Sequence, residues 1–190
     1  MENARKLTEN FHPSCEDDAK SVRIKYDGPT GLRDLLLHEL KSIYYIEKIL
    51  IKSFPKMIKH ACNYELIEAI TIHLADTKRQ IIRLEDTFSA MEEPPILHRS
   101  VAIECMLQEI DDIVEVTKFG MIRDAGIVLA LHKIEHYEIA TYRILSIYAE
   151  NLKSIKIQML MEESLNEEKI AEMRLVKIAQ SIQFFTNEIS

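Results

Sequence analysis

Residues 125–150, with the sequence AGIVLALHKIEHYEIATYRILSIYAE, decide the fold class of this chain. One stripe of side chains recurs there at steps of three and four residues, the spacing of a single helix face. The stripe consists of Val128, Leu131, Glu135, Glu138, Tyr142, Leu145 and Ala149. Because it is apolar at both ends and acidic in the middle, it predicts a long helix with carboxylates on its buried face. Tyr142, one turn after Glu138, is either a core residue or a hydrogen-bond partner of these acids.

The same spacing recurs in three other long segments, at about 31–61, 64–91 and 154–183, and in a shorter one at about 99–118. At 1.5 Å per residue, each long helix would span roughly 40 Å. Long helices of matching length, each with one apolar stripe, are typical of a four-helix bundle. We therefore predict an all-α four-helix bundle, with the short helix in the crossover between the second and third long helices.

Polar residues and a proline indicate where these helices begin, end or bend. Thr30, Asn63 and Asp124 are the expected N-caps of the first, second and third long helices. Asn151 is placed to take the left-handed position after the third long helix. Pro55 is expected to kink the first helix rather than to end it.

The composition agrees with a single helical domain. The chain has 190 residues, 47% of them hydrophobic, but only four Gly and five Pro, too few turn-formers for an all-β chain with many hairpins. We expect a flexible arm at residues 1–28 and one bundle domain at 29–185. Thirty-one acidic against 24 basic residues leave a net charge of −7. This charge argues against a partner such as nucleic acid or an anionic membrane, because both need a basic face.

The expected location is the cytoplasm. The first residues lack the apolar segment of a secretory signal, and no apolar run approaches the roughly 20 residues needed to span a bilayer. Cys15, Cys62 and Cys105 are widely spaced without a C-x-x-C pair, which fits a reducing compartment.

Ionisable residues interrupt every long stripe close to the middle of its helix. They are Glu47 in the first long helix, His73 and Asp76 in the second, Glu135 and Glu138 in the third, and Glu168 in the fourth. Mid-helix positions of antiparallel neighbours share one layer of a bundle. We therefore expect a cluster of carboxylates and an imidazole in the middle of the core.

Such a cluster needs compensation, because burying an isolated carboxylate costs several kcal/mol even after relaxation. No Lys or Arg lies on these stripes at the same level, so the acids must be protonated or bind cations. Oxygen donors with one imidazole suit two divalent first-row metal ions, iron first and manganese second. Magnesium or calcium would leave His73 without a role. Two pairs lie three residues apart, His73 with Asp76 and Glu135 with Glu138, and each can offer two ligands from one helix face to a shared metal pair.

Each residue also has a purely structural interpretation. A single Glu on a long helix, such as Glu47, is often exposed to solvent, and a lone His73 is more often a hydrogen-bonded core residue. Asp76 lies at the edge of its stripe and has a short side chain. Glu135 and Glu138 favour the metal interpretation because both interrupt one stripe.

Four motifs of this chain resemble the YciE/YciF family. They are LLLHEL at 35–40, HLADT at 73–77, IEHYEIATY at 134–142 and EEK at 167–169. The third matches the family's E-H-Y-E-I-A-x-Y run, and the motifs follow the family's order from about residue 31 to 180. Asp76 stands where the family usually has Glu, and Ile46 where it usually has Ala.

The resemblance implies a ferritin-like fold, a homodimer and a link to bacterial stress responses, in a family without an established activity. The leading hypothesis is a ferritin-like stress-response protein whose di-metal site handles oxygen or peroxide, as an oxidase or a peroxide-consuming enzyme. The alternative is a non-catalytic helical dimer that acts through protein contacts and keeps a structural or vestigial metal site. Iron storage is less favoured, because surfaces that would build a cage are not recognisable in the sequence.

Overall fold

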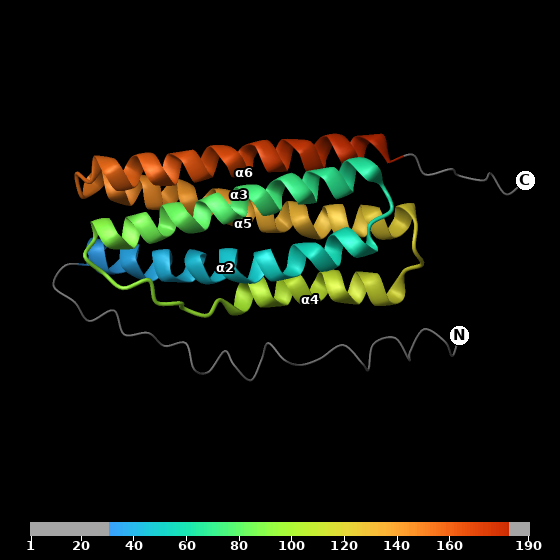
Figure 1. Cartoon of the computed structure of the whole chain (residues 1–190), viewed down its shortest axis with the longest axis horizontal. Coiled ribbons are helices and arrows are strands. Elements are labelled where there is room, and N and C mark those ends of the chain that lie inside the picture. Colours follow the sequence, from blue (N-terminus) through green and yellow to red (C-terminus); the bar gives the residue numbers. More distant parts are fainter. Residues whose placement is uncertain (1–30, 183–190) are drawn as a thin grey trace, which may run out of the picture.

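The computed structural model describes residues 31–182, which form five helices and no strand. The long helices are α2 (Leu32–His60), α3 (Tyr64–Ala90), α5 (Met121–Asn151) and α6 (Ile155–Ser181), and the shorter α4 is Val101–Val116. All five run along the long axis of the molecule (Figure 1). None of these helices has the length and apolar character that crossing a membrane requires. The predicted arm at residues 1–28 and the predicted cap Thr30 lie outside the described residues.

The four long helices form a ring of antiparallel neighbours. α2 and α3 make one antiparallel hairpin, and α5 and α6 make a second (Figure 1). α3 packs against α6 and α2 against α5, so each long helix is antiparallel to both of its neighbours. α4 lies outside this ring, packs on α5 and α2, and belongs to the crossover that joins α3 to α5. The predicted all-α bundle with a short crossover helix is therefore confirmed.

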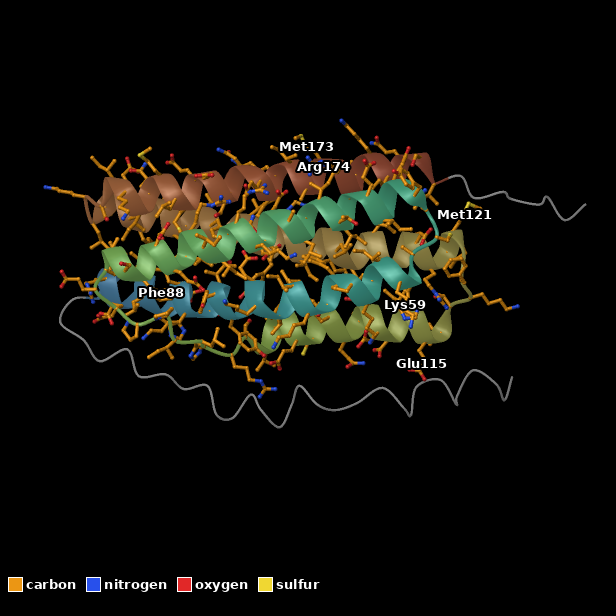
Figure 2. All side chains as sticks on the ribbon, in the orientation of Figure 1. Lys59, Phe88, Glu115, Met121, Met173 and Arg174 are labelled. Atoms are coloured by element: carbon orange, nitrogen blue, oxygen red, sulfur yellow. The ribbon has the colours of Figure 1, made fainter. Side chains whose placement is uncertain are left out.

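The predicted stripes form the core of this bundle. Leu50 and Phe54 of α2, Leu84 of α3 and Leu145 of α5 are almost completely shielded from solvent. Complete burial of an apolar side chain of this size contributes about 1.5–3 kcal/mol. Figure 2 shows side chains filling the space between the helices, whereas Glu115 of α4 points away from the bundle.

The local signals in the helices agree with the structure in part. Asn63 caps α3, because its Oδ1 accepts a hydrogen bond from the Leu66 backbone N–H at 3.0 Å. α2 continues through Pro55, as expected. The prediction for Asn151 is wrong: helical hydrogen bonding persists to this residue, and Lys153, at φ 57°, takes the left-handed position.

Asp124 does not cap its own helix, contrary to the prediction. α5 begins at Met121, after Gly120, so Asp124 lies within the first turn. The Asp124 carboxylate is buried and accepts hydrogen bonds from the backbone N–H groups of Cys62 and Asn63, at 2.9 and 2.8 Å. It therefore anchors the turn between α2 and α3 to the start of α5, through a contact that only tertiary packing creates.

Replacing Asp124 by Ala should lower the free energy of unfolding by about 2–4 kcal/mol, because two backbone N–H groups lose their acceptor. Urea denaturation followed by circular dichroism measures the change. Glu150→Ala, at an exposed acid of the same helix, is the control and should change stability by about 0.5 kcal/mol or less. Equal effects of the two substitutions would contradict the anchoring role.

Candidate metal centre

Five of the predicted site residues meet inside the bundle. α2 contributes Glu47, α3 contributes His73, α5 contributes Glu135 and Glu138, and α6 contributes Glu168. The four carboxylates are shielded from solvent, and His73 is only 5% exposed. Ligand atoms of all but Glu47 lie within 4.8 Å of one another. Residues far apart in the sequence converge because antiparallel packing brings the middles of the helices to one level.

The imidazole of His73 lies between two carboxylates. Its Nδ1 is 2.8 Å from Glu135 Oε1, and its Nε2 is 3.4 Å from Glu168 Oε2. Burial lowers the pKa of His73, but the charges of Glu135 and Glu168 outweigh burial and raise this pKa well above its ordinary value. A protonated His73 therefore compensates part of the negative charge when no cation is bound.

Burial also governs the protonation of the carboxylates. It raises the pKa of Glu135 to about 8, against the opposing effect of His73. Burial and the neighbouring acids raise the pKa of Glu47 and Glu138 well above the ordinary value. Burial acts in the same direction on Glu168, but His73 outweighs it and the pKa of Glu168 is lowered. The cation-free layer thus holds protons that an incoming metal ion would displace.

Two hydrogen-bond donors orient acids of this layer. The Tyr142 hydroxyl donates to Glu47 Oε1, and the Gln80 amide donates to Glu168 Oε1. Tyr142 of α5 thus serves an acid on α2 rather than an acid of its own helix. Gln80 is missing from the predicted site, although it lies seven residues, or two helical turns, after His73 on one face of α3.

Half of the acid oxygens of this layer have neither a hydrogen-bond nor an ion-pair partner. The unpartnered atoms are both oxygens of Glu138, Oε2 of Glu47 and Oε2 of Glu135, whereas Glu135 Oε1 and Glu168 Oε2 lie against His73. Unpaired buried polar atoms are costly, and native proteins rarely leave several together without a bound ion or water. Carboxylate and imidazole donors grouped in this way suit first-row divalent cations, so the residues present fit a di-metal centre.

Asp76 is the predicted ligand that the structure does not bring to this layer. Its carboxylate pairs with Arg79, one turn along α3, and lies 4.0 Å from Nη1 of Arg174, which Figure 2 labels on α6. A carboxylate that already accepts charge-assisted hydrogen bonds from arginine gains little from a cation. The short side chain at the edge of the stripe therefore turns to these arginines instead of the core.

A cavity of about 10 Å³ lies beside the acids, with His73, Glu135 and Arg174 in its wall. This volume is at the lower limit for one water molecule. Access to the buried acids from this side is therefore restricted to very small molecules.

Comparison with known protein families identifies one that spans all of the described residues. The family described as a domain of unknown function (DUF892) matches residues 31–184. The chain belongs to the DUF892 family. Protein YciF of Escherichia coli (strain K12) is 33% identical over 149 residues, which cover 78% of this DUF892 chain and 90% of YciF. The predicted relationship to the YciE/YciF family is confirmed.

Solved structures similar to this DUF892 chain share its fold. YcfI from Rhodopseudomonas palustris is 36% identical and has a TM-score of 0.76, covering 85% of this chain and 99% of its own. The E. coli stress protein YciF is 32% identical in its crystal structure, with a TM-score of 0.75 over 78% of this chain and 94% of its own. A protein from Xanthomonas campestris pv. campestris is 21% identical and has a TM-score of 0.65, covering 80% of this chain and 93% of its own. This similarity shows a shared fold alone.

Proposed function

We propose that this chain binds two divalent first-row metal ions in the middle of its bundle, iron first and manganese second, and acts on oxygen or peroxide in a stress response. One observation carries the proposal: acids from three helices and an imidazole from the fourth are buried together, and half of the carboxylate oxygens have neither a hydrogen-bond nor an ion-pair partner. Similarity to YciF, which is described as a stress protein, supports the physiological setting. A cytoplasmic location and a homodimer belong to the same proposal.

The proposed ligands are Glu47, His73, Glu135, Glu138 and Glu168. Glu135 and Glu138 lie three residues apart on α5, so both carboxylates project from one helix face and can be shared between two ions. The bound metals would supply redox chemistry toward oxygen or peroxide. Tyr142 and Gln80 hold two of the acids by hydrogen bonds. Asp76 is left out because its carboxylate already pairs with arginine.

Elemental analysis of protein purified without chelator should find iron or manganese, and much less of either in Glu135→Ala/Glu138→Ala. These substitutions remove two buried acids, three of whose four oxygens have no hydrogen-bond or ion-pair partner. The matched control is Glu115→Ala/Glu150→Ala, which removes two exposed acids and should keep the wild-type metal content. Absence of both metals from the wild type, or equal metal in the core variant, would falsify the di-metal centre.

A non-catalytic dimer is the second candidate, and apolar side chains exposed on α5 and α6 favour it. They include Leu129, Ile144, Met159, Ile170 and Met173. Exposed apolar surface is typical of sites of protein–protein contact when it forms a patch. A structural role has also been suggested for the similar protein YcfI.

Turnover separates the two candidates. Peroxide consumption or oxidase activity of the metal-loaded protein, lost in Glu135→Ala/Glu138→Ala, supports the enzyme. A protein without turnover, whose dimer mass and unfolding temperature are unchanged by chelation, is the non-catalytic dimer with a vestigial metal site. Light scattering coupled to size exclusion measures the mass.

A further inference from the structure

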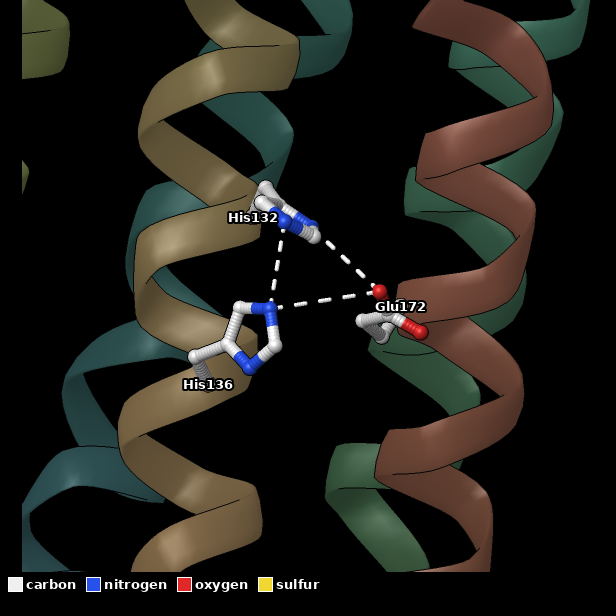
Figure 3. Close-up of side chains that lie close together, drawn as sticks. All are labelled: His132, His136 and Glu172. Carbon is white, nitrogen blue, oxygen red and sulfur yellow. Dashed lines mark hydrogen bonds and ion pairs between the residues drawn. The ribbon is translucent and has the colours of Figure 1, made fainter.

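A second group of metal-ligating side chains lies outside the core, between α5 and α6. His132 and His136 are four residues apart on α5 and project from one face, and Glu172 of α6 faces them (Figure 3). The three side chains are 31%, 58% and 22% exposed, so the group is open to solvent. None of the three is among the proposed core ligands.

The spacing of this group is close to that of ligands around one ion. The Nε2 atoms of His132 and His136 are 3.1 Å apart, and Glu172 Oε1 lies 3.8 Å from His132 Nδ1 and 3.9 Å from His136 Nε2. Glu172 is thus too distant for a hydrogen bond to either ring. Ligands at about 2.0–2.1 Å from a tetrahedral zinc ion are separated by about 3.4 Å, close to the 3.1 Å between the two Nε2 atoms and the 3.9 Å from His136 Nε2 to Glu172 Oε1. A bridging cation would close the gap with only small movements.

Hydrogen bonding alone does not satisfy these side chains. The contact between the two rings engages Nε2 of His132, whereas Nδ1 of the same ring is buried and has no hydrogen-bond partner. This unpartnered atom is also the one from which Glu172 lies 3.8 Å away. One ion can bind only one nitrogen of His132, and with one donor atom from each residue the three donors lie within 4.8 Å of one another.

We propose that His132, His136 and Glu172 form a mononuclear site for zinc, with solvent completing the coordination. Two imidazoles and one carboxylate suit zinc, whereas magnesium and calcium favour sites made of oxygen alone. Three protein ligands with one open position are typical of zinc sites that remain accessible to small molecules. The bound ion would also join α5 to α6.

The surface site is separate from the core layer. His136 directly follows Glu135, and Glu172 lies one turn after Glu168, yet the two glutamates of the core are fully buried while the surface group reaches solvent. One residue of offset turns His136 by about 100° around α5 from Glu135. Glu172 is displaced from Glu168 by one turn along α6 and is 22% exposed. The proposal therefore does not depend on metal binding in the core.

Zinc binding to the full chain tests this site. The core is first disabled by Glu135→Gln/Glu138→Gln, so that ions bound there do not interfere. Isothermal titration calorimetry of this variant, after chelation, should show that it binds one zinc ion from zinc chloride. Adding His132→Ala/His136→Ala should lower the affinity for this ion about 100-fold or more. His60→Ala, at the end of α2, is the matched histidine control and should leave the zinc affinity unchanged.

Three further measurements distinguish a lost zinc site from a misfolded variant. Glu172→Gln keeps the size of the third ligand and should weaken zinc binding about 10-fold or more, with an unchanged circular dichroism spectrum. In the otherwise wild-type chain, His132→Ala/His136→Ala should lower the zinc stoichiometry by one. Cobalt(II) in place of zinc should give visible absorption that the histidine substitutions remove.

Zinc binding that is absent from the core-disabled protein, or that is unchanged by the histidine substitutions, overturns the surface site. If the core holds no iron or manganese but the protein still binds one zinc ion at the surface site, this inference is supported and the proposed function fails. The two ideas are thus separated by the same set of variants.

Discussion

Adding manganese(II), or iron(II) without oxygen, to the chelated protein should raise its unfolding temperature by about 10 °C. A ligand that binds only the folded chain stabilises it by about 4 kcal/mol when its free concentration is 1,000 times Kd. For a chain of this size, 1 kcal/mol corresponds to about 2–4 °C. Differential scanning calorimetry with and without metal measures the rise.

Glu138→Gln should lose most of this stabilisation by metal. The substitution keeps the shape of the side chain but removes the charge of a buried carboxylate whose two oxygens are unpartnered. Glu150→Gln, at an exposed position of α5, is the matched control and should keep the full rise. An equal rise in Glu138→Gln and the wild type would show that Glu138 is not a ligand.

Without metal, the protein should become less stable as the pH rises from 5 to 8. Burial raises the pKa of Glu135 to about 8 and those of Glu47 and Glu138 well above the ordinary 4.5. Above pH 4.5 the folded chain keeps protons that the unfolded chain has released, so stability falls with increasing pH. The raised pKa of His73 acts in the same direction above 6.5, whereas the lowered pKa of Glu168 changes stability only below 4.5.

Urea denaturation of the chelated protein between pH 5 and 8 measures this dependence, and we expect a loss of a few kcal/mol. Glu138→Gln should flatten the curve, because an amide does not titrate in this range. The metal-loaded protein should show the reverse trend, because metal binding releases protons and strengthens as the pH rises. Equal stability of the chelated wild type at pH 5 and pH 8 would contradict the burial of these acids.

The helices were predictable because their signal is local. A stripe with steps of three and four residues needs only helical geometry, so four long helices and a shorter one could be placed from the sequence. The start of α5 was the exception, at Met121 instead of about 125. Asp124 has the chemistry of a cap, but the backbone N–H groups that it satisfies belong to Cys62 and Asn63, far away in the sequence.

The level of the acids along the bundle was predictable for a similar reason. Glu47 and Glu168 both lie near the middle of their helices, and antiparallel packing turns equal distance from the helix ends into one layer. The direction of a side chain at the edge of a stripe was not predictable. Asp76 turns toward Arg79 and Arg174, and the second of these arginines comes from α6.

By itself, the sequence determined the helices, their buried faces and the level of the acids along the bundle, because these depend on spacing along one chain. The tertiary structure decided which donors face one another, because that depends on how the helices are rotated and offset. Gln80 reaches Glu168, and Glu172 approaches His132 and His136, only because α6 packs against both α3 and α5.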